Sequence, residues 1–297
     1  MSRRLRAASG RFVLAVVLLR CLAVAPAAAS EVRITWQPAR PNAGDVALLR
    51  VQGVPGGVPV EGDLDGHPLS MYPTADGYAA LVGIDMDTPD GPREWRVMIG
   101  GPTPRATSGR LHVVARSYKV QHLTVARHMA ELDPETERRA VNEIERLRTL
   151  YRMTSGERLW QGAWQRPVPG DAPGTGFGAR RVINGLPRAP HSGIDFGAAV
   201  GTPVAAANRG RVALVGEFFF PGRLVILDHG LGLYTLYFHL DTIAVTEGQL
   251  VGRGQTLGTV GMTGRVTGPH LHFGAQLGAA RIDPAVLLGL EDAAPAR

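Results

Sequence analysis

Cysteine is almost absent from this sequence: the only one among 297 residues is Cys21. A disulfide framework or a cysteine-ligated metal site needs several cysteines, so both are excluded. A long apolar run is lacking as well. The stretch Phe12–Leu19 stops at Arg20, well short of the roughly 20 apolar residues that a membrane-spanning helix requires.

The first residues instead have the order of a secretory signal peptide. A basic region precedes the apolar stretch, and the small residues Ala27-Ala28-Ala29 follow it. We therefore expect residues 1–29 to be removed on export to the periplasm, the cell envelope or the medium, with Ser2-Arg3-Arg4 indicating twin-arginine export as an alternative. Arg20 stands where a lipoprotein signal requires a small residue before Cys21, so no stable membrane anchor is expected after cleavage.

Excess positive charge is also missing once that segment is set aside. The formal net charge is +6, and removal of five arginines and no acids leaves 6 − 5 = +1; these arginines are at positions 3, 4, 6, 11 and 20. A nearly neutral chain gives no electrostatic reason to expect nucleic-acid binding. Stability must come from core packing and, if one binds, from a metal ion.

Residues 31–116 are predicted to form a β-sandwich-like accessory domain. Short runs such as Val46–Val51, Gly77–Met86 and Glu94–Ile99 are separated by turn residues, and Asp65-Gly66 is a hairpin dipeptide. No cluster of ionisable side chains occurs here. The region is predicted to be a spacer or a binding module.

Residues 117–161 are predicted to be a linker with one amphipathic helix. Asp133 suits the N-cap and Pro134 the first helical position. The apolar side chains then recur on one face, which should pack against a neighbour; they are Val141, Ile144, Leu147, Leu150 and Tyr151. Residues 162–290 are rich in glycine and in short, evenly spaced β-branched runs, which indicates a compact antiparallel β-domain. The predicted fold class is mainly β.

The residues with the strongest chemical signal are His270 and His272. On a strand, residues i and i+2 point to the same face. The two imidazoles should therefore lie together, while Leu271 and Phe273 point into apolar packing. Such a pair suits a metal or acid–base site, although the spacing alone also occurs by chance.

His191 and Asp195 form a second candidate pair. On an ideal strand they would be about 13 Å apart at roughly 3.3 Å per residue, too far to share one ion. Gly193 argues against a helix, so we expect a bend near Ser192-Gly193 that brings them together. A histidine, a carboxylate and a third ligand from elsewhere match catalytic zinc sites, which keep one position open for water. His239 ends an apolar strand and alone would more often be structural; His229, in a predicted turn, is expected to be structural.

Three segments together resemble the M23 metallopeptidase family, of the lysostaphin/LytM type. They occur in family order between about Phe177 and Pro284 and are accompanied by Arg180-Arg181 and Asn184-Gly185, which are also family-like. The segments are His191-x-x-x-Asp195, Tyr237-x-His239-Leu240 and Gly264-x-x-Thr267-Gly268-Pro269-His270-Leu271-His272-Phe273.

The resemblance implies a zinc endopeptidase that cuts peptidoglycan stem or cross-bridge peptides. His191, Asp195 and His272 would bind Zn²⁺, and His239 and His270 would be catalytic without binding the metal. One alternative is a non-catalytic relative that binds cell wall or activates a hydrolase; another is a peptidase acting on exported protein. The division of labour between His239 and His270, the bond that is cut and the oligomeric state stay open.

Overall fold

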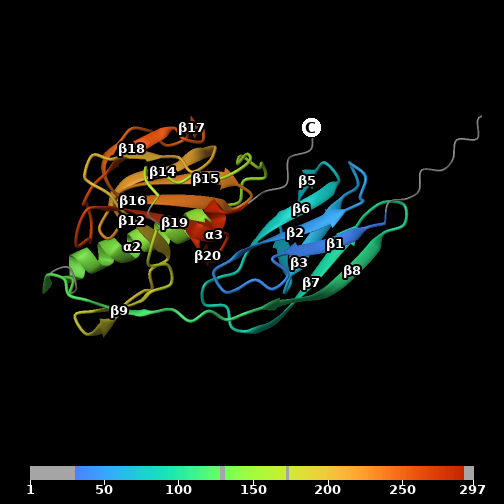
Figure 1. Ribbon diagram of the computed structural model, residues 1–297, viewed down its shortest axis with the longest axis horizontal. Coiled ribbons are helices and arrows are strands. Elements are labelled where there is room, and N and C mark those ends of the chain that lie inside the picture. The colour runs from blue at the N-terminus through green and yellow to red at the C-terminus, as the bar shows by residue number, and fades with distance from the viewer. Residues whose placement is uncertain (1–30, 128–130, 172–173, 291–297) are drawn as a thin grey trace, which may run out of the picture. The chain divides into compact units, whose positions relative to one another are not determined.

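The computed structural model describes residues 31–127, 131–171 and 174–290. The predicted signal peptide lies outside these residues. Within them strands are the commonest regular element and pair mainly antiparallel, and the helices are α2, Pro134–Tyr151, and α3, Pro284–Leu288 (Figure 1). The predicted mainly β fold class is confirmed. Neither α2 nor α3 has the length and apolar character needed to span a membrane.

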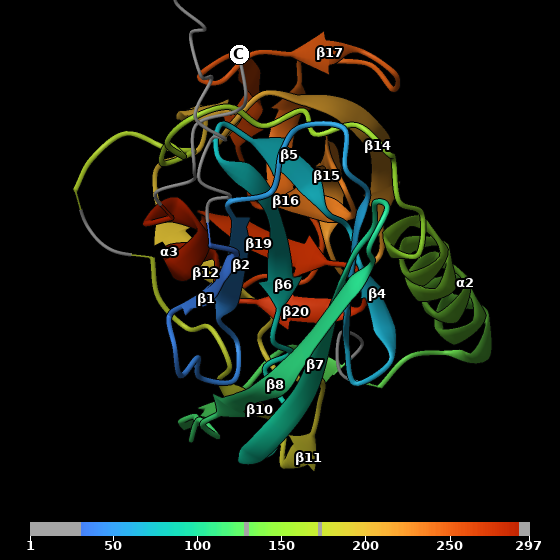
Figure 2. The ribbon, with the colours of Figure 1, turned by 90° about the vertical axis from the view of Figure 1, so that its right-hand side faces the viewer.

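Residues 33–113 form two four-stranded antiparallel sheets (Figure 2). The first has the order β1-β2-β6-β5, with β1 Arg33–Gln37, β2 Val46–Gln52, β6 Gly77–Gly83 and β5 Tyr72–Thr74. The second has the order β4-β3-β7-β8, with β4 His67–Leu69, β3 Val60–Leu64, β7 Gly91–Ile99 and β8 Arg105–Val113. Between β3 and β4, Asp65 and Gly66 have φ angles of 50° and 77°. Positive φ at both central residues favours the primed turn of a tight hairpin.

The middle of the chain contributes a strand that the sequence did not predict. β9, Val120–Leu123, pairs in parallel with β10, Arg180–Ile183, which also pairs with β11, Leu186–Pro187. Residues 120–123, expected to belong to a linker, are thus part of a sheet that includes residues close to His191.

Helix α2 begins where the capping signal predicted. The carboxylate of Asp133 accepts hydrogen bonds from the backbone N–H groups of Glu135 and Thr136. Its apolar face is buried only in part, because Val141 and Ile144 are 58% and 39% exposed. The predicted packing against a neighbour therefore holds for part of this face only. The C-terminal part, from Leu147 to Tyr151, does pack against buried residues of a neighbouring sheet, with α2 beside strand β14, Gly210–Phe218 (Figure 2).

The large sheet has nine strands and carries the predicted site residues. Its main path is β12-β19-β16-β15-β14-β17, while β13 and β18 pair with each other, β18 also with β16, and β20 with β19. The bounds are β12 Gly193–Gly197, β13 Pro203–Ala205, β14 Gly210–Phe218, β15 Gly222–Gly230, β16 Leu233–Ile243, β17 Leu250–Val251, β18 Thr256–Val260, β19 His270–Leu277 and β20 Ala280–Ile282.

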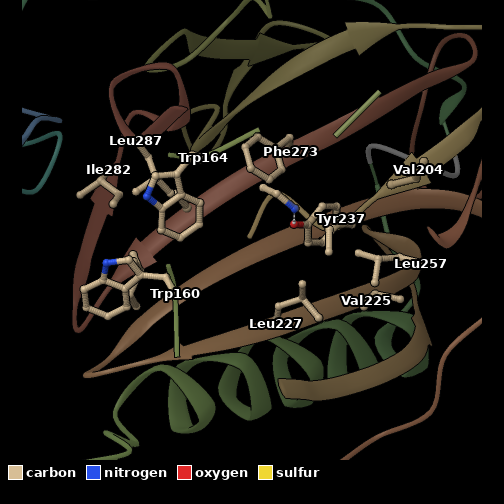
Figure 3. Close-up of a cluster of buried hydrophobic side chains, with 14 of the residues drawn as sticks. Trp160, Trp164, Val204, Val225, Leu227, Tyr237, Leu257, Phe273, Ile282 and Leu287 are labelled. Carbon is tan, nitrogen blue, oxygen red and sulfur yellow. Dashed lines mark hydrogen bonds between the residues drawn. The ribbon is translucent and has the colours of Figure 1, made fainter. Parts of the chain in front are cut away.

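One face of this sheet forms the main core. Tyr237 and Phe273 are opposite each other on β16 and β19, both with no exposed surface, and their rings are 5.4 Å apart (Figure 3). Burial of side chains of this size stabilises the fold by roughly 1.5–3 kcal/mol each. Residues of the first N-terminal sheet join the same core: the ring of Tyr72 lies edge-on to that of Trp160 at 5.7 Å.

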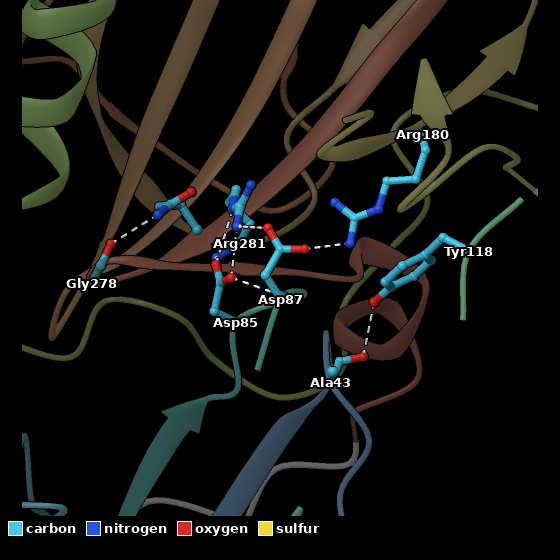
Figure 4. Close-up of polar contacts among 8 residues, drawn as sticks. Ala43, Asp85, Asp87, Tyr118, Arg180, Gly278 and Arg281 are labelled. Carbon is cyan, nitrogen blue, oxygen red and sulfur yellow. Dashed lines mark hydrogen bonds and ion pairs between the residues drawn. The ribbon is translucent and has the colours of Figure 1, made fainter. Parts of the chain in front are cut away.

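Charged side chains add a second contact between the N-terminal sheets and the large sheet. Arg281 on β20 donates to Asp85 through Nε at 3.0 Å and through its terminal nitrogen at 2.7 Å, and to Asp87 at 2.7 Å (Figure 4). Asp87 also accepts a hydrogen bond from Arg180. A two-pronged guanidinium–carboxylate contact fixes orientation as well as distance.

Candidate metal centre

The pairing of β12 with β19 brings two candidate ligands together. In this antiparallel pair Asp195 is directly opposite His272. Directly opposed residues point to the same face, with Cβ atoms about 5 Å apart. The Nδ1 atom of His272 lies 3.0 Å from Oδ1 of Asp195.

His191 reaches the same point from outside the strand. It precedes β12, and its segment pairs with residues 178–179: His191 N–H donates to the Ala179 carbonyl, and Gly178 N–H donates to the His191 carbonyl. Its Nε2 lies 3.0 Å from Asp195 Oδ1 and 2.8 Å from His272 Nδ1. The strand starts only at Gly193, so the long separation expected of an ideal strand does not arise.

Glycine is required at position 193 by the closeness of these groups. A Cβ atom there would lie 2.6 Å from Nε2 of His272 and 2.6 Å from the Phe273 carbonyl oxygen. Such contacts are well inside van der Waals distance. The small residue between His191 and Asp195 therefore leaves room for the His272 ring.

The charge state of these groups suits a metal ion. Burial raises the pKa of Asp195, but hydrogen bonds from His191 and His272 lower it further, so the net pKa is well below its ordinary value. Burial lowers the pKa of His272 to about 4. At neutral pH the group therefore offers a carboxylate and a neutral imidazole, the forms that bind metals.

The three ligand atoms are also close enough to one another to bind a single ion. They are separated from one another by 2.8 to 3.0 Å. One ion can touch all three at the ~2.0–2.2 Å typical of metal–nitrogen and metal–oxygen bonds in tetrahedral sites. Among the described residues, His191, Asp195 and His272 are the one group of ionisable side chains with this arrangement. We call them the triad.

His239 is directed toward the triad by an irregularity in β16. The pairing of β16 with β15 shifts register beside it, and its φ angle is +65°. This left-handed conformation is uncommon for a residue with a side chain and is often found near functional sites. Its backbone N–H donates to Pro221, and its Nδ1 lies 2.9 Å from the Thr263 carbonyl. A carbonyl only accepts, so Nδ1 carries the proton and Nε2 is the basic atom.

His270 has the same tautomer for the same reason. Its Nδ1 lies 2.8 Å from the Gly268 carbonyl, and its Nε2 is 3.7 Å from Oδ1 of Asp195. The rings of His239 and His270 are 4.9 Å apart. Burial, followed by the charges of His272 and His270, lowers the pKa of His239 to about 3. Its imidazole is therefore neutral near pH 7.

His229 lies outside this site. It has no exposed surface, and its Nδ1 donates to the Arg209 carbonyl at 2.8 Å. The Nε2 atom is 2.7 Å from the Thr235 hydroxyl, which is 3.0 Å from the hydroxyl of Tyr237. The Tyr237 hydroxyl in turn accepts from Ala207 N–H at 2.8 Å. This is a closed chain of buried hydrogen bonds.

One arginine next to the triad, Arg181, was not predicted to belong to the site. Arg181 places a terminal nitrogen 3.8 Å from Oδ2 of Asp195. The charges of Arg181 and Arg188 both act on the guanidinium of Arg265. The signal in the sequence that could have identified it is that Arg181 belongs to a family-like segment.

Comparison with known proteins agrees with this geometry. The sequence profile of peptidase family M23 matches residues 189–284, which contain all five residues of the proposed site. A solved structure from Pseudomonas aeruginosa assigned to M23 peptidases is 30% identical, with a TM-score of 0.60, and the alignment covers 84% of this chain and 96% of that one. This chain belongs to peptidase family M23. The resemblance inferred from the three motifs is confirmed.

Two curated relatives of this M23 chain are from Vibrio cholerae. Peptidoglycan DD-endopeptidase ShyB is 34% identical over 170 residues, which are 56% of this chain and 36% of ShyB. Peptidoglycan DD-endopeptidase ShyA is 47% identical over 85 residues, which are 29% of this chain and 20% of ShyA. The M23 chain thus matches about a third or less of the length of these relatives.

Proposed function

We propose that this chain is a zinc-dependent endopeptidase that hydrolyses peptide bonds in the stem or cross-bridge peptides of peptidoglycan. The observation that carries the proposal is the convergence of His191, Asp195 and His272 on one point, with the rings of His239 and His270 beside it. The names of ShyB and ShyA support the substrate class. Export into the periplasm or cell envelope after loss of residues 1–29 would bring the chain to that substrate.

Zinc is the metal that this set of ligands favours. Two imidazole nitrogens and one carboxylate oxygen are a known catalytic zinc set, in which three protein ligands leave a fourth position for water or substrate. Nε2 of His191, Oδ1 of Asp195 and Nδ1 of His272 would hold the ion. When bound, zinc supplies Lewis-acid chemistry, which acidifies water and polarises a carbonyl.

His239 and His270 would then move protons. Each has Nδ1 fixed by a backbone carbonyl, so Nε2 is the ring nitrogen left to exchange a proton with water or substrate. Such a nitrogen accepts a proton from attacking water and can return it to the leaving amine. Once protonated, either imidazole can also donate a hydrogen bond to the developing oxyanion. Burial lowers the pKa of His239, so its imidazole is neutral near pH 7 before any proton is transferred.

The division of the chain is part of the proposal. Residues 31–116 would be an accessory domain, 117–161 a linker with one helix, and 162–290 the peptidase domain. The contacts of Arg281 with Asp85 and Asp87 would hold the accessory domain to the peptidase domain.

The test is hydrolysis of isolated cell-wall sacculi by the purified protein. We expect one zinc ion per chain, release of new amino groups from sacculi, loss of this activity with a chelator, and recovery with added zinc. His270→Ala should hydrolyse sacculi at least about a hundredfold more slowly and still bind zinc. His67→Ala, which changes an exposed histidine on β4, should behave like the unchanged protein.

Two results would contradict the proposal. Tight binding to sacculi without any release of amino groups would indicate a wall-binding or hydrolase-activating protein. Chelator-sensitive cleavage of denatured proteins with intact sacculi would indicate a peptidase that acts on exported protein.

A further inference from the structure

The turn of the β14–β15 hairpin is held by a residue of helix α2, which runs beside β14 (Figure 2). The two strands pair as far as Phe218 and Gly222, so the turn consists of the residues between them. The backbone N–H of Phe219, the first of these, donates to Oε2 of Glu143 at 2.7 Å. A partly buried N–H group needs an acceptor, and a carboxylate forms a stronger hydrogen bond than a neutral acceptor does.

The direction of the Glu143 side chain is fixed within the helix. Its Oε1 accepts from Nε of Arg139 at 2.7 Å, and a terminal nitrogen of Arg139 donates to the Glu217 carbonyl at 3.2 Å. The Glu143 side chain is 16% exposed, whereas that of Glu145 is 52% exposed and lies near two arginines at the end of the helix. Helix α2 is therefore joined to the hairpin by one carboxylate and one guanidinium.

The other end of the same turn holds the backbone of His239. The backbone N–H of His239 donates to the Pro221 carbonyl at 2.8 Å, and Pro221 is two residues from Phe219. This contact lies where β16 shifts its pairing with β15 and where His239 has a φ angle of +65°. A left-handed residue with a side chain persists when its surroundings fix it. The Pro221 carbonyl is one of the groups that do so.

Thr263 connects the ring of His239 to the hairpin as well. Its carbonyl accepts from Nδ1 of His239 at 2.9 Å, and its hydroxyl accepts from the Arg223 N–H at 2.9 Å. A Cβ atom on Gly222 would clash with this hydroxyl, so glycine is required there for the two segments to meet. The backbone and the ring of His239 are therefore both positioned against residues 219–223.

We propose that Glu143 is a positioning residue for His239: it holds the turn whose other end fixes the left-handed backbone of His239, and so keeps this ring beside those of His270 and His272. The proposal rests on the proposed function, because the position of the ring affects catalysis if His239 transfers protons. It gives helix α2, which was expected from the sequence to be a packing element, a part in the reaction.

The kinetic test uses a soluble cross-linked peptide fragment of sacculi as substrate. Glu143→Ala should lower kcat about tenfold with KM and zinc content unchanged, because a displaced catalytic group loses rate while substrate and metal still bind. Glu143→Gln should restore kcat to within about twofold, since its amide oxygen can still accept from Phe219 N–H. Glu145→Ala removes the same charge from an exposed position of the same helix and should keep the full kcat.

A second measurement follows the His239 ring and does not depend on hydrolysis. In protein with isotope-labelled histidine, the Nδ1 protons of His239 and His229 are each donated to a backbone carbonyl and should give separate NMR signals. In Glu143→Ala the His239 proton should exchange with water about tenfold faster, while the His229 proton is unaffected. Arg139→Ala, which removes the ion pair of Glu143, should shift kcat and exchange in the same direction by a smaller factor.

Three results would overturn the positioning role. They are a loss of kcat in Glu143→Ala with the exchange of His239 unchanged, no recovery in Glu143→Gln, and loss of the His229 signal in Glu143→Ala, which would mean that Glu143 supports the whole fold. Failure of the endopeptidase is scored separately. A protein that never hydrolyses sacculi, yet shows faster His239 exchange in Glu143→Ala and not in Glu145→Ala, would keep the contact between α2 and His239 and refute the proposed function.

Discussion

Two buried histidines on the same sheet, His272 and His229, differ in what surrounds their rings. Burial lowers the pKa of each to about 4. In His229 both ring nitrogens have a partner that completes a hydrogen-bond chain. In His272, Nδ1 instead faces a carboxylate oxygen and another imidazole nitrogen, at 3.0 and 2.8 Å.

The difference teaches that a displaced pKa marks burial, while the convergence of several ligand atoms marks a site. A buried polar group whose hydrogen bonds are complete specifies a fold. A group of acceptors facing one another calls for a proton or a cation between them. The two regions should therefore respond differently to substitution.

The largest effect should follow from removing a triad carboxylate. Asp195→Ala should lose stoichiometric zinc and lower hydrolysis of sacculi by about a thousandfold or more, because the ion no longer has three protein ligands. Zinc content by mass spectrometry and release of amino groups measure the two outcomes. If the variant retained one zinc per chain and normal activity, the metal would have to be bound elsewhere.

His270→Ala should lower hydrolysis by about 10²–10⁴-fold, the usual contribution of a positioned acid or base. Zinc content should stay at one per chain, since His270 Nε2 is farther from Asp195 than either triad nitrogen. Comparison with His239→Ala would show how much of the proton transfer depends on each of the two histidines. Loss of zinc along with activity would move His270 from proton transfer to metal binding.

The third prediction concerns the closed chain around His229. His229→Ala should reduce the free energy of unfolding by about 2–4 kcal/mol. The Arg209 carbonyl and the Thr235 hydroxyl would lose their hydrogen bonds to the imidazole while they stay buried, and the packing against Trp164, whose ring lies 4.9 Å away, would be lost. Urea unfolding of the chelator-treated protein measures this. The folded variant should still take up one zinc ion; a variant that folded but bound none would break the contrast between the two regions.

The smallest effect is a change in pH dependence. His229 has an ordinary pKa of 6.5 and a folded pKa of about 4, so between these values only the unfolded chain binds the proton. The free energy of unfolding is therefore unaffected by this group above pH 6.5. It falls as the pH decreases from 6.5 toward 4, by about 1.4 kcal/mol per pH unit, because protonation of His229 stabilises only the unfolded chain. His229→Gln should remove this part of the slope in urea unfolding of the metal-free protein. His67→Gln, an exposed histidine, should leave the slope unchanged; equal slopes for all three proteins would contradict the assignment.

Local patterns in the sequence predicted two features of the triad and the residues around it. Alternation along a strand placed His270 and His272 on one face, and Gly193 correctly argued against a helix between His191 and Asp195. The register that sets Asp195 opposite His272 depends on pairing between strands 77 residues apart, which no local pattern encodes.

Other features depended on tertiary packing. The left-handed conformation of His239 accompanies a shift in the pairing of β15 with β16, and the sequence has no glycine between Gly232 and Gly248 that would have signalled a bulge. The exposed Val141 and Ile144 show the reverse case, because helical periodicity identifies an apolar face but not the partner that would cover it.

Strand β10 has a consequence for how substrate contacts could be transmitted through the molecule. Its neighbouring residues Arg180 and Arg181 contact Asp87 in one direction and Asp195 in the other. A displacement of the strand that lengthens one contact must alter its neighbour, since one peptide unit joins them. A change in the position of Asp87 would thus be transmitted through these two residues to the carboxylate of Asp195.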